Sequence, residues 1–259
     1  RSRFGCSCSY GWARRPPRLY FFGLVTYSDG MLSSGTWGVE WLPLAALLLP
    51  FFSGSHGGPG ESVDLPGLPE PLTWLVPPLE WRVEDGRLAV KAPACTDLFR
   101  DPTGKVVIDN SPRAMFSPEG PFLLSVRVEV DFRSDFDAGV LMVYADEGAW
   151  AKLCFEYSPQ KEPTVVTVVN DGLSDDCNHE ALPSNRVFLR IARLEQNVYA
   201  FHYSRDGLRW RLARYFRLKS TAVPRVGFSA QSPTGVGCMV EFSQIRYEPR
   251  RLEDLRGGS

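Results

Sequence analysis

Hydrophobic and polar residues alternate in short stretches along the chain from residue 71 onward. Stretches rich in Val, Ile, Phe, Tyr and Trp recur about every ten residues, and Gly, Pro, Asn and Asp separate them. Residues 124–132 alternate apolar and polar side chains, which predicts a strand with one face on a core and the other toward water. Residues 138–144 are almost continuously apolar and predict a buried strand. The spacing as a whole predicts an all-β sandwich or barrel.

The same pattern continues toward the C-terminus. Residues 146–148 predict a turn, and residues 150–157 predict a second strand after it. Residues 187–193 and 198–203 predict a hairpin. Further strands are expected at residues 164–170, 210–216, 226–230 and 238–247. Beyond residue 70, no stretch of about ten residues has a helical period, so no long helix is expected.

The N-terminal part of the chain has a different character. Residues 42–52 form an apolar run of eleven residues that prolines interrupt, which is too short to span a bilayer. That length suits a signal peptide, although no Lys or Arg lies between Met31 and the run. Residues 53–70 are rich in Gly, Pro and Ser and indicate a linker. We therefore expect an irregular leader and linker over residues 1–70, with a targeting segment at residues 31–55 as the alternative.

The remaining chain divides into a sandwich and a tail. We assign the sandwich to residues 71–248, a length that buries enough apolar surface for a stable core without disulfides. Residues 249–259 are charged and then Gly-rich, and we expect them to form a flexible tail.

Composition and charge narrow the classes of function. Lys and Arg number 29 and Asp and Glu 30, so a nucleic-acid partner is not expected. Six Cys in 259 residues do not indicate a disulfide scaffold. No apolar run reaches the ~20 residues of a membrane span. Asn110-Ser111-Pro112 fails as a glycosylation sequon, so we expect a cytoplasmic location, with secretion as the alternative if residues 31–55 act as a signal.

Several segments carry a resemblance to a known family when they are taken in order. These segments are residues 96–100, 136–143, 150–157, 164–169, 174–175 and 203–210. Together they resemble the regulation-of-enolase-type family of concanavalin A-like domains, a family of unknown function, from near Trp74 to near Tyr247. The resemblance implies a jelly-roll sandwich of two antiparallel sheets. It implies little about chemistry, because a fold does not determine function.

One predicted strand carries a candidate ligand-binding cluster. Trp150, Lys152 and Glu156 lie at alternate positions and therefore share one face of the strand. Sugar sites combine an aromatic platform with a few polar groups that orient the ligand. The polar motif of the family adds three more residues, Thr96, Asp97 and Arg100. The alternative is that Trp150 caps the core, and that Lys152 pairs with Glu156 or with a neighbouring strand.

The sequence supports a catalytic site or a metal site less well than it supports this ligand-binding cluster. Glu129 and Asp131 lie two positions apart, but Arg133 and Ser134 stand where a glucanase pattern needs a third acid. We interpret Glu129 and Asp131 as the solvated face of an alternating strand. The polar residues 171–180 carry oxygen ligands that suit calcium, although a solvated turn explains them as well. We expect no catalytic residues, metal or cofactor.

The sequence thus favours a non-catalytic binding module with a glycan or protein ligand. An intracellular regulatory domain that binds another protein is the alternative, and a glycoside hydrolase is the second alternative.

Overall fold

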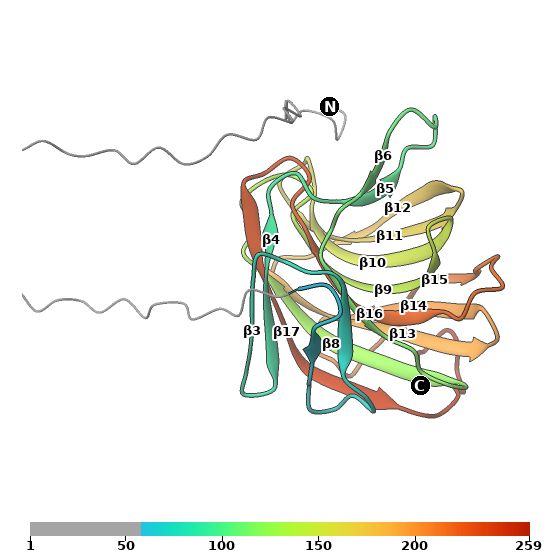
Figure 1. Ribbon diagram of the computed structural model, residues 1–259. Coiled ribbons are helices and arrows are strands. Elements are labelled where there is room, and N and C mark those ends of the chain that lie inside the picture. The colour runs from blue at the N-terminus through green and yellow to red at the C-terminus, as the bar shows by residue number, and fades with distance from the viewer. Residues whose placement is uncertain (1–57) are drawn as a thin grey trace, which may run out of the picture. The chain divides into compact units, whose positions relative to one another are not determined.

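The computed structural model describes residues 58–259, which form two facing antiparallel sheets and contain no helix (Figure 1). The eight-stranded sheet has the order β1 (Ser62–Val63), β2 (Leu72–Val76), β7 (Arg113–Phe116), β16 (Arg225–Gln231), β9 (Ala138–Asp146), β10 (Ala149–Tyr157), β11 (Pro163–Asp171) and β12 (Leu173–Ala181). The seven-stranded sheet has the order β15 (Arg211–Arg217), β14 (Val198–Ser204), β13 (Arg186–Glu195), β8 (Phe122–Val130), β17 (Gly237–Glu248), β4 (Arg87–Pro93) and β3 (Glu80–Glu84). A two-stranded ribbon joins β5 (Leu98–Arg100) to β6 (Val107–Asp109). The predicted all-β sandwich is confirmed.

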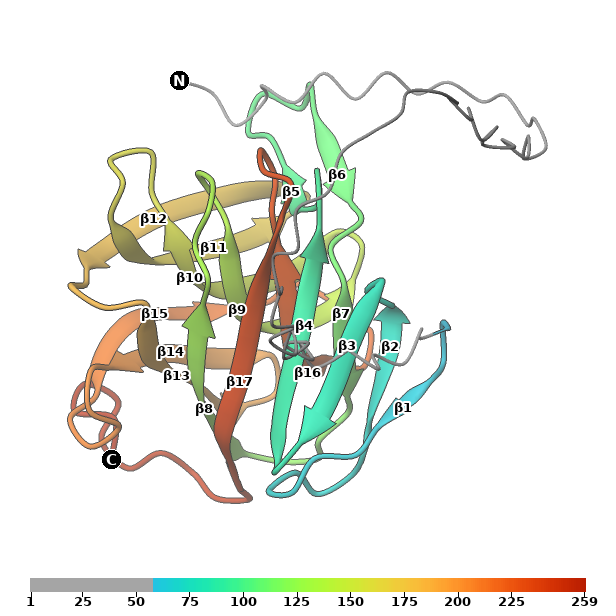
Figure 2. The same cartoon turned by 90° about the vertical axis from the view of Figure 1, so that its left-hand side faces the viewer.

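Strand β8 shows why the alternating pattern forms a half-buried strand. Val126, Val128 and Val130 are fully buried between the sheets, and the polar residues between them are partly exposed. Strands β13 and β17 pair with β8 on its two sides, and Figure 2 shows β17 running between β8 and β4. The interpretation of Glu129 as a residue on the solvated face agrees with this register.

Strand β9 is buried on both faces, which explains its almost continuous apolar sequence. Leu141 and Val143 point into the main core between the two sheets. Val140 and Met142 belong to a second cluster on the opposite face, where Leu98 and its neighbour Phe99 cover them. The hairpin of β5 and β6 therefore gives the eight-stranded sheet a second apolar layer.

The core of the sandwich begins earlier than the sequence suggested, its last strand ends at Glu248 as expected, and the tail after it packs onto a sheet. Val63 and Leu65, which we placed in a linker, are buried in the main core. In the expected flexible tail, Leu252 and Leu255 pack onto a small apolar cluster on the seven-stranded sheet. The tail packs on this face because the face carries apolar side chains. Covering these side chains removes apolar surface from water, which is favourable. The expected leader and targeting segment up to residue 57 lies outside the described residues.

Polar contacts also hold the tail. The Nε2 of His202 donates to the carbonyl of Leu255 at 2.8 Å, and Arg190 donates to the carbonyl of Gly258. The Arg190 guanidinium lies 3.6 Å from the centre of the Trp210 ring, and Gly258 lies close against Trp210. Burial lowers the pKa of Arg190 to about 10, even though its guanidinium stacks on the ring.

Candidate ligand-binding site

Strand β10 places three of the predicted site residues on one face. Trp150, Lys152 and Glu156 alternate with inward-facing Leu153 and Phe155, as the sequence predicted. The shared face lies on the outer side of the eight-stranded sheet, away from the main core. The hairpin of β5 and β6 lies beside this face at the end near β12 (Figure 1).

Thr96 connects the base of this hairpin to the sheet. Its hydroxyl donates to the carbonyl of Pro93 at 2.7 Å and accepts from the amide of Ser232 at 3.2 Å. A backbone bridge between Thr96 and Ser232 strengthens this connection. The next residue, Asp97, is thereby directed toward strand β10.

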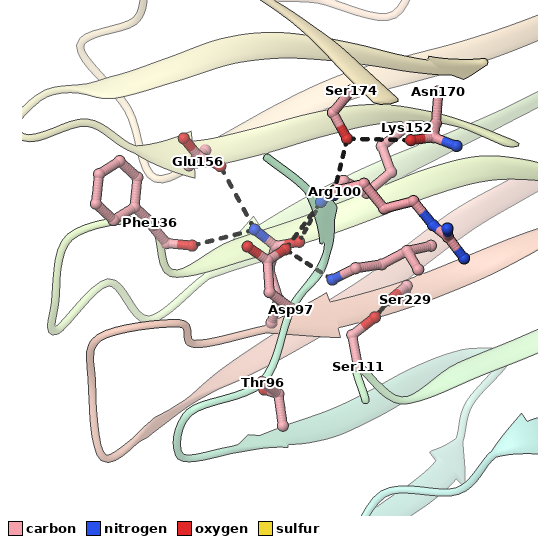
Figure 3. A network of polar contacts seen from close by, with 12 residues as sticks. Thr96, Asp97, Arg100, Ser111, Phe136, Lys152, Glu156, Asn170, Ser174 and Ser229 are labelled. Carbon is pink, nitrogen blue, oxygen red and sulfur yellow. Dashed lines mark hydrogen bonds and ion pairs between the residues drawn. The ribbon is translucent and has the colours of Figure 1, made fainter. Parts of the chain in front are cut away.

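A buried polar network joins the hairpin to the strand (Figure 3). The ammonium of Lys152 lies 3.0 Å from Asp97 Oδ1 and 2.9 Å from Gln231 Oε1. The amide of Gln231 lies 3.5 Å from Glu156 Oε2 and donates to the carbonyl of Phe136 at 3.4 Å. The side chains of Lys152 and Asp97 are 1% and 2% exposed, so the ion pair is shielded from water.

Gln231 is the residue of this polar network that the sequence analysis missed. It lies at the end of β16, where register pairs it with Ala138, the residue that also pairs with Glu156. The only signal in the sequence was a polar residue just after a predicted strand that ends at Ala230.

Trp150 is fully buried, and this limits what it can contact. Its ring lies 5.7 Å from the ammonium of Lys152, and the two groups form a cation–π contact. Within residues 58–259, the indole N–H has no hydrogen-bond partner. Trp150 therefore packs against the polar network from inside the protein. This position agrees better with the alternative of a core aromatic residue than with an exposed platform for a sugar.

Arg100 is the one predicted site residue that solvent reaches appreciably. Its backbone amide donates to the hydroxyl of Ser174 at 3.0 Å, and Ser174 in turn donates to Asn170 Oδ1 at 3.3 Å. Asn170 also donates to the carbonyl of Gly148 at 2.7 Å. These contacts fix the end of β5 on strand β12.

A row of side chains continues from this point across five strands. Register aligns Ser174, Asn170, Trp150, Tyr144 and Arg225. The Arg225 guanidinium lies 5.7 Å from the centre of the Tyr144 ring, and that of Arg113 lies 5.2 Å from it. Burial raises the pKa of Tyr144, which keeps its hydroxyl neutral. Ser174 and Asn170 place hydrogen-bonding groups at the end of β5, and Arg225 places a positive charge at the opposite end of the row.

In the polar stretch at residues 171–180, the turn is limited to Gly172 and the residues after it belong to edge strand β12, so most of the expected solvated turn is a strand. Its polarity reflects an exposed edge that pairs with β11 on one side only. No three His, Cys, Asp or Glu side chains of residues 58–259 gather as a metal site. In the same part of the chain, no helix has the length and apolar character needed to cross a bilayer.

Comparisons with known proteins agree with this architecture. Regulation of enolase protein 1 of Saccharomyces cerevisiae is 26% identical over 172 residues, which are 66% of this chain and 86% of that protein. The crystal structure of a functionally unknown protein from Saccharomyces cerevisiae aligns with a TM-score of 0.63 and 25% identity, covering 68% of this chain and 95% of that one.

A third match has lower sequence identity, and the name of that protein includes the designation GH43. The GH43 protein BlXynB from Bacillus licheniformis aligns with a TM-score of 0.56 and 16% identity, covering 69% of this chain and 37% of that one. At this identity the likeness shows the fold alone. The family described as a protein of unknown function (DUF1349) matches residues 74–250, most of the sandwich. The chain therefore belongs to the DUF1349 family.

Proposed function

We propose that the sandwich is a non-catalytic binding module that recognises a glycan at the hairpin of β5 and β6. The observation that carries this proposal is the position of Arg100. Its backbone is held on β12 by Ser174, and it is partly exposed to solvent. Within the described residues, its guanidinium has no hydrogen-bond or ion-pair partner. A planar guanidinium donates in a fixed fork, which suits the neighbouring hydroxyls of a sugar.

The buried residues support Arg100 by positioning the hairpin. Removing a charged group from water costs several kcal/mol, so a buried ion pair is seldom retained for stability alone. Lys152 and Asp97 join strand β10 to the hairpin through such a pair. A preorganised hairpin reduces the entropy that binding would otherwise cost. Thr96, Trp150 and Glu156 take part in the same support, beneath the surface that a glycan would contact.

The geometry argues against the hydrolase alternative. Glycoside hydrolysis needs two carboxyl groups that both reach the substrate. Asp97 and Glu156 are the two acids of the polar network, and they are 1% and 3% exposed. Asp97 is paired with Lys152, and Glu156 lies beside Gln231. Neither carboxylate is placed to meet a glycosidic bond.

A glycan array probed with the full chain tests the proposal. We expect binding to at least one glycan, and a loss of about tenfold in affinity in Arg100→Ala, since one charged hydrogen bond contributes about 1.5 kcal/mol or more. Arg217→Ala is the matched control, because Arg217 is an exposed arginine on strand β15 of the other sheet. Equal binding by Arg100→Ala and the parent chain would exclude this site. A folded chain that binds no glycan would exclude the function.

A protein-interaction role is the second candidate. The yeast relative carries the name Regulation of enolase protein 1, and regulation often proceeds through contact with another protein. The specific observation in its favour is an open groove near the start of the sandwich, formed by other residues than the hairpin site.

A further inference from the structure

A groove of about 660 Å³ lies where the segment before β2, the loop between β7 and β8, and the end of β17 meet. This volume falls in the range of about 300–1,000 Å³ that is usual for ligand sites. Its apolar walls come from one tyrosine, one leucine and three prolines: Tyr247, Leu68, Pro69, Pro118 and Pro249. Its charged lining residues are Glu70 and Glu119, both exposed.

The groove is held in shape before any ligand arrives. The amide of Tyr247 donates to the carbonyl of Gly67 at 3.1 Å, and the amide of Ser117 donates to Glu70 Oε1 at 3.0 Å. Arg193 donates to the carbonyl of Pro118 at 3.1 Å and so holds the loop between β7 and β8, which forms one side of the groove. The proline rings add stiffness, because they fix their own backbone angle. Binding to such a groove needs little further ordering.

Tyr247 supplies both a flat surface and a polar group. Its ring stacks on Phe122 at 5.7 Å and meets the edge of Phe116 at 5.9 Å, so it is firmly oriented. Burial raises the pKa of Tyr247, so its hydroxyl stays protonated at neutral pH. Within residues 58–259 that hydroxyl has no hydrogen-bond partner. It can therefore donate to a carbonyl of a bound chain.

We propose that this groove binds a proline-rich peptide that carries an arginine. A polyproline II segment presents flat rings and backbone carbonyls that have no internal hydrogen bonds. Its proline rings can pack against the proline and tyrosine side chains that line the groove, and its carbonyls can accept a hydrogen bond from the Tyr247 hydroxyl. Glu70 and Glu119 select a positive charge and disfavour an acidic ligand. This site is separate from Arg100 and does not depend on glycan recognition.

Fluorescence anisotropy with the full chain tests the proposal. The probe is a labelled ten-residue peptide of eight prolines and two arginines, and a control peptide has glycine at every proline position. We expect Glu70→Gln/Glu119→Gln to weaken binding of the proline peptide about tenfold or more, and Tyr247→Phe to weaken it severalfold. Both changes preserve side-chain size and so should preserve the fold. Glu84→Gln, at an exposed acid on β3, is the matched control.

Four results would overturn the proposal. The first is no binding of the proline peptide by a chain that is folded by circular dichroism. The second is equal binding of the glycine peptide, which would indicate non-specific charge attraction. The third is binding that the groove variants leave unchanged. The fourth is a glycan on the array whose binding only Tyr247→Phe abolishes, which would assign the groove to a sugar. Loss of glycan binding in Arg100→Ala with intact peptide binding would leave this inference standing.

Discussion

Replacing Lys152 by methionine tests whether the polar network holds the hairpin to the sheet. The change removes the ammonium and keeps a long apolar side chain. It leaves the Asp97 carboxylate with the amide of Leu98 at 2.7 Å and without its positive partner. It also leaves Gln231 Oε1 without the donor that now lies 2.9 Å away.

The magnitude follows from the distance and the burial. Two unit charges 3.0 Å apart attract by about 5 kcal/mol at an effective dielectric constant of about 20. Desolvation offsets most of that attraction while the pair is intact, but removing one partner leaves a buried charge uncompensated. Such changes typically cost about 3–5 kcal/mol. For a domain of about 200 residues, this cost corresponds to a fall in melting temperature of about 10 °C.

Urea unfolding of the full chain, followed by tryptophan fluorescence, measures the cost of Lys152→Met. Lys91→Met is the control, because Lys91 lies 2.7 Å from Glu80 while both side chains are more than 40% exposed. Exposed pairs contribute about 1 kcal/mol or less. The double variant Lys152→Met/Asp97→Leu should recover most of the loss, since it removes both charges. If Lys152→Met costs no more than Lys91→Met, the pair is not shielded from water and the hairpin is not held in this way.

Three further changes probe the tail and the core. Gly258→Ala would place a Cβ 2.6 Å from Trp210 Cβ at a φ of +72°, so we expect a loss of more than about 1 kcal/mol and faster hydrogen exchange throughout the tail. Burial lowers the pKa of His202 from 6.5, although its bond to a carbonyl and nearby Asp254 oppose this. The folded state prefers the neutral form of His202, so the stabilisation is fully present above pH 6.5 and is lost as the pH falls from 6.5 toward the lower pKa of the folded state. The urea midpoint of unfolding should therefore fall across this pH window. The fall should be smaller in His202→Gln. Gly139→Ala would drive a methyl group into Val128, and calorimetry should show a loss of about 1–3 kcal/mol.

The two proposed surfaces make separate claims about function. Glycan recognition depends on Arg100 and on the network that positions it, whereas peptide recognition depends on Tyr247 and two glutamates in a different part of the sandwich. Either activity can be present without the other. The array and the anisotropy measurement on the same set of variants therefore distinguish four outcomes, and each outcome assigns a role to one surface, to both or to neither.

Local patterning predicted most of the strands. Alternation predicted β8 and the shared face of Trp150, Lys152 and Glu156, because the side chains of a strand alternate whatever lies next to it. It did not predict β12 as a strand, because an exposed edge has few apolar positions to mark it. It also did not place Val63 in the core or the tail on the sheet, since both depend on surfaces that distant strands supply.

The candidate site shows the same division between sequence and tertiary structure. The sequence by itself determined which face of β10 carries Lys152, and it drew attention to Asp97 through a family motif. Only the tertiary structure decided that Lys152 meets Asp97, 55 positions earlier, and Gln231, 79 positions later. It also decided that Trp150 is buried and that Arg100 is partly exposed. The physical reason is that contact and burial depend on which segments cover a face, and no local period of the sequence records the segment that comes to lie on top.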